Sequence, residues 1–161
     1  MKFRKVVVGG TFDYFHDGHA ALLSKAFEVG EEVELGICSD EMQELLMKDS
    51  AGIQPLSMRM WMVLDFLKQK GWLPRAKLAV LFDPFGPAAS DRGAEAIVVS
   101  PETRPKAEEL NRLRASKGLP QLSVVEVPFV PSEDGRPISS IRIRYGEMDQ
   151  RGKILKTSHV Q

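Results

Sequence analysis

Two of the chain's 3 histidines stand three residues apart, immediately after an apolar run near its start. The stretch GGTFDYFHDGH, residues 9–19, places His16 and His19 around Gly18. The glycines that open the stretch allow a sharp turn and let a ligand approach the backbone. If a helix begins at Asp17 or Gly18, its free N–H groups and dipole favour an anion. Two imidazoles at such a position can hold phosphate oxygens and stabilise charge that develops on them.

This stretch also allows other interpretations. A P-loop needs Gly-Lys followed by Ser or Thr, which the sequence lacks, and the GxGxxG dinucleotide pattern is also absent. A metal site would combine the two histidines with a carboxylate such as Asp13 or Asp17. The histidines can also be structural residues of a turn. From these residues alone, the metal site and the structural role stay open beside the phosphate site.

A second group of polar residues stands near the other end of the chain. ISSIRIR, residues 138–144, places Ser139 and Ser140 before Arg142 at a predicted helix start. Either serine can cap that helix. Hydroxyls, free N–H groups and a guanidinium also form a phosphate cradle. One anion-binding helix start after the first strand and another after the last suit a nucleoside triphosphate.

Composition limits the class of protein. The 161 residues suit one domain, and 22 basic against 22 acidic residues create no overall field that attracts nucleic acid or a membrane. Charge is uneven, with acids concentrated in residues 28–49 and bases in 136–156. The single cysteine, Cys38, fits a reducing compartment and a buried strand end. No signal peptide or membrane span is expected, so we predict a soluble, cytoplasmic protein.

The elements that must position these groups alternate between strands and helices. Short apolar runs predict strands at 5–10, 32–38, 77–82, 96–100 and 122–130. Helical patterns lie between most of them, so we expect a doubly wound, Rossmann-like α/β domain with a five-stranded parallel sheet. Ligands of such sheets bind beyond the carboxyl ends of the strands, where the histidines stand. We expect the domain to span 1–149 and the tail, 150–161, to be loose.

The paired motifs resemble a known superfamily. HxGH after a glycine-rich first strand, with a late ISSxxIR, is the signature of the HxGH nucleotidyltransferases, and the resemblance covers residues 5–149. More narrowly, DPFGPAASD, ISSIRIRYGEMD and the segment from AIVVSPETR to SKGLP look like archaeal phosphopantetheine adenylyltransferases. They are also similar to the adenylyltransferase domain of eukaryotic coenzyme A synthase. The resemblance implies a reaction of ATP with 4′-phosphopantetheine that gives dephospho-coenzyme A and pyrophosphate.

The resemblance also implies roles for individual residues. His19 and His16 would contact the phosphates, Thr11 would orient both reacting phosphates, and Lys48 would bridge them unless it is only a cation in an acidic loop. Asp83 would close the acceptor pocket, or merely form a turn. Mg²⁺ would arrive with ATP. The residues expected to contact ATP are Gly9, Gly10, Thr11, Phe12, His16, His19, Glu109, Asn111, Arg114, Ser139, Ser140 and Arg142.

Some features depart from the family or leave alternatives. The segment after the second strand is usually rich in lysine but offers only Lys48, and Pro105 and Lys106 replace a small or glycine-rich step. Glu109, Asn111 and Arg114 also fit an ordinary solvated helix face. The acceptor can instead be nicotinamide or flavin mononucleotide or a phospho-alcohol, and a nucleotide-binding regulator without turnover is the non-enzymatic alternative. The oligomeric state, monomer or small homo-oligomer, stays open.

Overall fold

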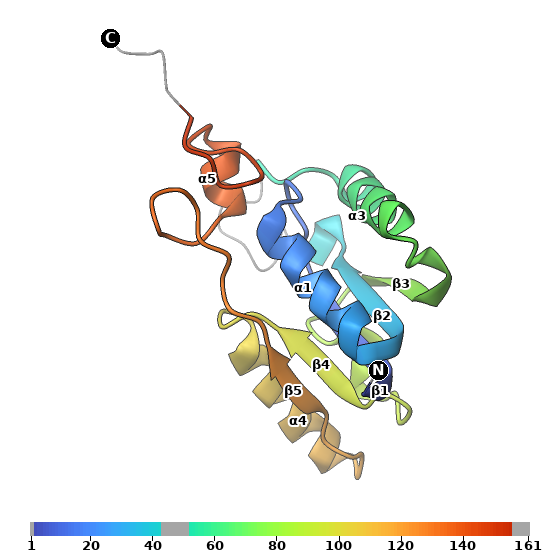
Figure 1. The fold of residues 1–161 in the computed structure, drawn as a ribbon. Helices are drawn as coiled ribbons and strands as arrows, with labels where there is room; N and C mark the ends of the chain where they lie inside the picture. The colour runs from blue at the N-terminus through green and yellow to red at the C-terminus, as the bar shows by residue number, and fades with distance from the viewer. Residues whose placement is uncertain (1, 43–51, 156–161) are drawn as a thin grey trace.

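The computed structural model describes residues 2–42 and 52–155, so Lys48 lies outside the described residues. Its core is a sheet of five strands, all parallel, in the order β3-β2-β1-β4-β5 (Figure 1). The strands are β1 Phe3–Gly10, β2 Gly30–Cys38, β3 Ala76–Leu81, β4 Ala96–Val99 and β5 Ser123–Glu126. The helices are α1 Asp17–Val29, α3 Leu56–Lys70, α4 Arg104–Ser116 and α5 Ser140–Arg144, with short 3₁₀ turns η1 Leu73–Arg75 and η2 Gly86–Ala89. The predicted doubly wound fold is confirmed.

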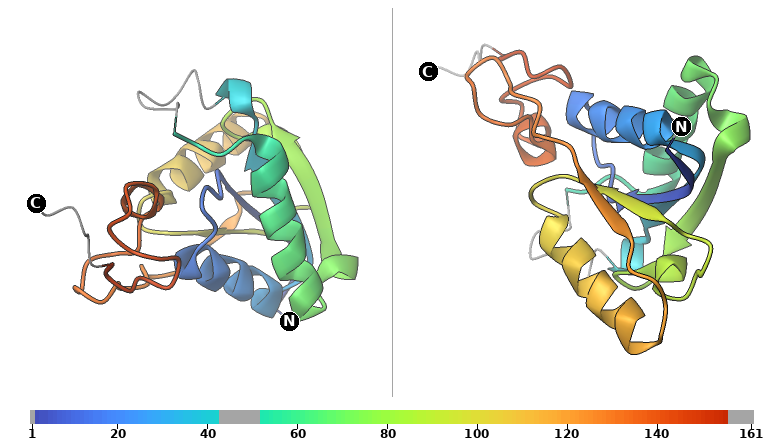
Figure 2. Two further views of the ribbon diagram at one scale, coloured as in Figure 1. Left: turned by 90° about the horizontal axis from the view of Figure 1, so that it is seen from above. Right: turned by 60° about the horizontal axis from the view of Figure 1, so that its bottom comes forward.

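Alternation along β1 gives the sheet two covered faces. Val6 and Val8 point to the face where Leu23 of α1 and Leu67 of α3 pack, and all four side chains are buried. Val7 points to the opposite face, which η2 and α4 cover. Figure 2 shows α1 and α3 on one side of the sheet and α4 on the other. Because both faces are buried, the central strands are apolar almost throughout, as the sequence indicated.

The fifth strand is shorter than its apolar pattern suggested. Residues 122–130 predicted one strand, whereas β5 ends at Glu126. Val127 still donates a hydrogen bond to Val99, but the next residue, Pro128, has no N–H group. The chain then leaves the sheet and runs toward the carboxyl ends of the strands, where α5 forms near the start of α1 (Figure 1).

The C-terminal segment is folded further than expected. The backbone N–H of Asp17 donates to the carbonyl of Gln150 at 2.9 Å, and Leu155 donates to Glu147 at 3.0 Å. The carboxylate of Asp149 accepts from the N–H groups of Arg151 and Lys153. The expectation of a loose tail therefore does not hold for residues 150–155, which cover the first turn of α1, while 156–161 lie outside the described residues.

Arg114 does not reach the nucleotide site that the sequence predicted for it. Its side chain is fully buried, and it donates hydrogen bonds to the carbonyls of Ala88, Asp91 and Pro120 at 2.7–2.9 Å. Because these carbonyls belong to two loops, Arg114 fastens both to α4. The structure corrects the predicted ATP contact to a role in holding loops.

Its two neighbours on α4 do not reach that site either. Asn111 exchanges two hydrogen bonds with the backbone of Leu122, at 3.0 and 2.7 Å. Glu109 is exposed to solvent. Neither residue lines the cavities described below. The alternative of an ordinary helix face suits Glu109, whereas Asn111 fastens the start of β5.

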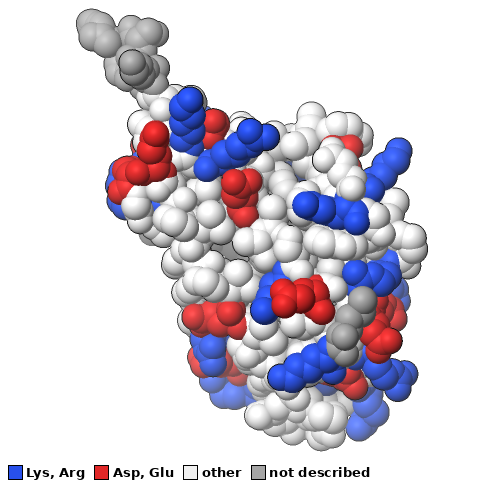
Figure 3. Space-filling view, viewed as in Figure 1, with Lys and Arg blue, Asp and Glu red and all other residues white. Residues whose placement is uncertain are grey.

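Charges of both signs are mixed on the surface. On the face shown in Figure 3, lysine and arginine side chains alternate with aspartate and glutamate, and neither sign forms a continuous field. Within the described residues, no helix is long and apolar enough to cross a membrane.

Replacing Arg114 with Met should lower the free energy of unfolding by about 2–4 kcal/mol, because three carbonyls, of which that of Ala88 is buried, lose their donor. Urea denaturation measures this change, and the exposed Arg112→Met on the same helix is the matched control. ATP affinity of the folded R114M protein should stay within about threefold of wild type. Unchanged stability together with lost ATP affinity would restore the role that the sequence suggested.

Candidate active site

The loop between β1 and α1 is held in an unusual conformation. Phe12 and Tyr14 have φ angles of 56° and 46°, in the left-handed region that non-glycine residues rarely adopt. The side-chain oxygen of Gln54 accepts from the N–H of Tyr14, and the backbone N–H of Gln54 donates to the Asp13 carboxylate at 2.9 Å. The Phe12 ring is buried and lies 5.3 Å from the ring of His19, centroid to centroid. These contacts hold a strained loop, of the kind that concentrates at functional sites.

The two histidines cap the helix that they open. Nδ1 of His16 accepts from the N–H of Gly18 at 3.0 Å, and Nδ1 of His19 accepts from the N–H of His16 at 3.1 Å. Their rings stack with centroids 3.7 Å apart. Because each Nδ1 accepts a hydrogen bond from a backbone N–H, we assign the proton of each neutral ring to Nε2. Each histidine can therefore donate one hydrogen bond from Nε2.

Burial keeps both imidazoles neutral at pH 7. It lowers the pKa of His16 to about 4. Burial, and then the neighbouring His16, lower the pKa of His19 well below its usual value. A neutral pair can bind an anion through its donors and gain charge as negative charge develops nearby.

The carboxylates named for the alternative metal site lie as follows. Asp13 is buried and accepts from Gln54, and burial is the main cause that raises its pKa. Asp17 is exposed at the first position of α1. Across residues 2–42 and 52–155, no three His, Cys, Asp or Glu side chains form a group that could hold a metal ion.

A cavity of about 570 Å³ joins the histidines to the C-terminal segment, and we call it the polar cavity for the histidine, serine and arginine side chains among its mixed lining. Both serines of ISSIRIR and Arg142 line it, as the paired motifs predicted. The Ser139 hydroxyl caps α5 by accepting from the N–H of Arg142 at 3.4 Å. The Ser140 hydroxyl donates to the Asp13 carbonyl at 2.6 Å and so links the two halves of the site, 127 residues apart in the chain.

Arg142 is held by two carboxylates that the sequence motifs did not single out. Its guanidinium contacts Asp134 at 2.5 Å and Glu147 at 2.8 Å. Arg142 and then the Ser132 hydroxyl hold the pKa of the Asp134 carboxyl well below its usual range. These contacts orient the guanidinium beside the cavity before a ligand binds.

Arg59 is a further residue that sequence reasoning missed. Its side chain is fully buried, and Nη1 donates to the carbonyls of Thr11 at 3.0 Å and Cys38 at 2.8 Å. The same guanidinium donates to the Gln54 carbonyl and pairs with Asp40 at 2.8 Å. It therefore fixes the carboxyl ends of β1 and β2 relative to each other. Its signal was present in the sequence, because Arg59 stands four residues before Val63 on the apolar stripe of α3.

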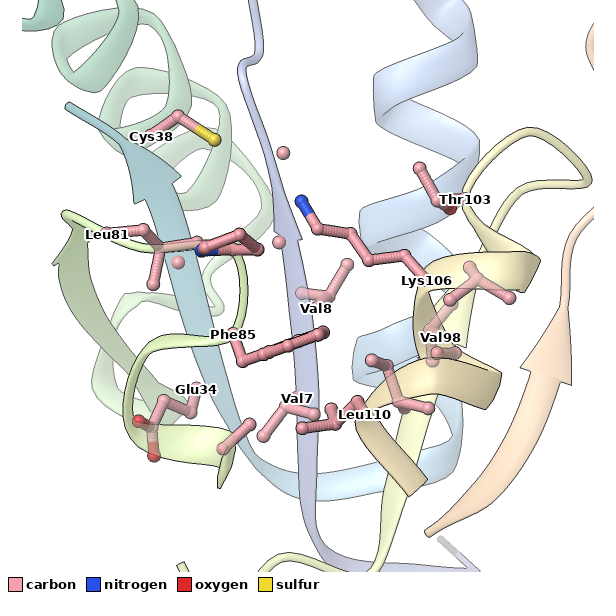
Figure 4. Close-up of a pocket in the computed structure, with 18 of the residues that line it drawn as sticks. Val7, Val8, Glu34, Cys38, Leu81, Phe85, Val98, Thr103, Lys106 and Leu110 are labelled. Carbon is pink, nitrogen blue, oxygen red and sulfur yellow. The ribbon is translucent and has the colours of Figure 1, made fainter. Parts of the chain in front are cut away.

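A second cavity, of about 220 Å³, lies on the α4 side of β1. Its wall is mostly apolar and includes Val7, Leu81, Phe85, Val98 and Leu110 (Figure 4). The backbone segment 9–11 lines this apolar cavity and also the polar one. The two cavities therefore meet at the carboxyl end of β1, at the switch point between β1 and β4, where open α/β sheets bind ligands.

Asp83 shapes the wall of the apolar cavity from outside. Its carboxylate is exposed and accepts from the N–H groups of Phe85 at 3.0 Å and Gly86 at 2.7 Å. These hydrogen bonds form a turn, so the contacts of Asp83 agree with the expectation of a turn residue and not with that of a residue that closes the acceptor pocket. The turn places the Phe85 ring against the cavity, whereas Asp83 itself does not line it.

The cytidylyltransferase-like family model matches residues 7–146. The chain belongs to this family. It is 44% identical to the phosphopantetheine adenylyltransferase of Methanothermobacter thermautotrophicus, over 96% of this chain and 92% of that protein. It is 46% identical to the phosphopantetheine adenylyltransferase of Methanopyrus kandleri, over 92% and 93%.

A solved structure agrees with this placement. The chain resembles a crystal structure of a protein of unknown function from Archaeoglobus fulgidus, with a TM-score of 0.68, 25% identity, and coverage of 94% of this chain and 99% of that one. The superfamily and the archaeal branch that the motifs indicated are confirmed by the curated relatives.

The buried, neutral His16 should make stability depend on pH. Its pKa is about 4 in the folded chain and about 6.5 when unfolded, so the unfolded state binds more protons between these values. The contribution of neutral His16 to the free energy of unfolding is fully present above pH 6.5 and is lost as the pH falls toward 4. At pH 5 the loss is on the order of 2 kcal/mol.

Urea denaturation at pH 7.5 and pH 5 measures this effect. His16→Asn keeps a cap without a titrating ring, so it should lose less stability than wild type over that interval. Ser139→Ala removes a different cap and should keep the wild-type pH dependence. Equal pH dependence in wild type and H16N would show that His16 is not buried in its neutral form.

Proposed function

We propose that the chain transfers the adenylyl group of ATP to 4′-phosphopantetheine. One observation carries the proposal: segment 9–11 lines both a polar cavity with two imidazole donors and an apolar cavity suited to an uncharged arm. The curated archaeal relatives, similar over more than nine-tenths of this chain, carry the name of that activity. Dephospho-coenzyme A and pyrophosphate would be the products.

The reaction needs no protein base. An oxygen of the acceptor phosphate attacks the α-phosphorus of ATP, the bond from that phosphorus to the oxygen of the β-phosphate breaks, and pyrophosphate leaves with the electron pair. The protein must therefore align two phosphates and stabilise the charge of the transition state. Nε2–H donors from His16 and His19 can do this, because the backbone already holds both rings.

The rest of the triphosphate would lie toward the C-terminal segment. Arg142 and the start of α5 border the same cavity as the histidines, so they would hold the β- and γ-phosphates. The Thr11 hydroxyl and the backbone of Gly10 and Phe12 would orient the reacting groups. Mg²⁺ would enter on the phosphates of ATP as part of the substrate.

The shape of the apolar cavity favours the pantetheine acceptor over a mononucleotide. A planar nicotinamide or flavin ring needs an aromatic wall. Phe85 is the one aromatic residue among the described residues that line the apolar cavity. Phe82 is 70% exposed and Trp61 is 60% exposed. A mostly aliphatic cavity of about 220 Å³ suits the flexible pantetheine arm better.

The test is an acceptor screen that measures pyrophosphate release with ATP and Mg²⁺. We expect kcat/KM for 4′-phosphopantetheine to exceed the values for nicotinamide and flavin mononucleotide by at least about 100-fold, because only the first fits the cavity. The His19→Ala variant is the control for the site: its turnover should fall about 10²–10³-fold, with a smaller change in ATP binding. A preference for a mononucleotide refutes the acceptor, and no turnover with any acceptor favours a nucleotide-binding regulator.

A further inference from the structure

Lys106 places a positive charge inside the apolar cavity. It is the third residue of α4, and its half-buried side chain crosses the cavity toward the carboxyl end of β1 (Figure 4). Within the part of the chain that the structure describes, its ammonium makes no hydrogen bond or ion pair. Its neighbour Arg104 differs, because its guanidinium pairs with Glu126 at 3.2 Å and Glu108 at 3.6 Å.

The surroundings of Lys106 do not stabilise this charge. A helix start favours anions, yet the first turn of α4 has no acidic residue. The one carboxylate among the described residues that line the cavity is Glu34, which pairs with Lys5 at 3.2 Å. A partly desolvated ammonium with neither a carboxylate nor a favourable dipole is suited to an anionic ligand.

We infer that Lys106 binds the phosphate of the acceptor at the carboxyl end of β1, an inference that rests on the proposed function. Lys106 lies on the side of segment 9–11 to which we assign the acceptor, so its ligand is the acceptor phosphate and not ATP. The ammonium reaches segment 9–11 from the α4 side, through the cavity assigned to the pantetheine arm. The histidines line the polar cavity, to which we assign the triphosphate, and do not line the apolar one.

This position gives Lys106 two effects on the reaction. Its ammonium can donate up to three hydrogen bonds, so it can hold the attacking phosphate next to the α-phosphate. It also offsets the repulsion between two negatively charged phosphates that must approach each other.

The test compares acceptors with and without the phosphate. Isothermal titration calorimetry with 4′-phosphopantetheine and with pantetheine measures how much the phosphate adds to binding in wild type, K106R, K106Q and K117Q. Lys117 is the matched control, because it is exposed at the far end of α4. We expect the phosphate's contribution to fall about 10-fold or more in K106Q, to persist largely in K106R, and to stay unchanged in K117Q.

Steady-state kinetics separates the two substrates. In K106Q the KM for 4′-phosphopantetheine should rise about 10-fold or more, while the KM for ATP should change less than about twofold. Equal phosphate discrimination in wild type and K106Q, or a rise confined to the KM for ATP, would overturn the inference. An active wild type with an unaffected K106Q refutes this role alone, whereas a wild type that neither binds nor adenylylates 4′-phosphopantetheine refutes the proposed function and this inference together.

Discussion

The reciprocal hydrogen bonds between His16, His19 and the start of α1 are the constraint on which the site depends. They satisfy two backbone N–H groups of the helix start and fix both rings through Nδ1. The same bonds direct each Nε2 away from the backbone and toward a ligand. The strained loop before the helix supports this arrangement, because the ring of Phe12 packs against His19. The same two histidines therefore stabilise the helix start and are positioned to bind phosphate.

Other contacts bring distant segments to that cap. The Ser140 hydroxyl joins α5 to the Asp13 carbonyl, and the Gln150 carbonyl accepts from the first residue of α1. From the opposite side, Arg59 holds the carbonyls of Thr11 and Cys38. Each of these contacts ends on a backbone carbonyl, so they hold the backbone of the loop in addition to the contacts of Phe12 and Asp13. The position of the site therefore depends on where the sheet places the carboxyl ends of β1 and β2.

Much of this organisation could be predicted from the sequence. Apolar runs located all five strands, and the two polar motifs came together in one cavity because both follow strands of a parallel sheet. Gly71, which follows α3, adopts the left-handed conformation with φ 74° that glycine commonly takes at the end of a helix. These features follow from local propensity and from the direction of parallel strands.

Sequence reasoning did not find the contacts of charged residues that lie on the apolar stripe of a helix. Arg114 lies seven residues after Ala107 on the buried face of α4, and Arg59 lies on the buried face of α3. Periodicity identifies such positions as interior, but it does not reveal which carbonyls a guanidinium meets there. The same limit applies to Asp134 and Glu147, whose contacts with Arg142 depend on how loops fold back. Loop partners of this kind follow from tertiary structure and not from spacing.

The protonation state of the two histidines tests the account most directly. Long-range ¹H–¹⁵N correlation spectra of the ligand-free chain at pH 7 distinguish the two neutral tautomers from imidazolium. Both His16 and His19 should be neutral with the proton on Nε2, because Nδ1 accepts a backbone hydrogen bond in each ring and burial lowers both pKa values. An imidazolium, or a proton on Nδ1 of either ring, would contradict the cap on which the site is built.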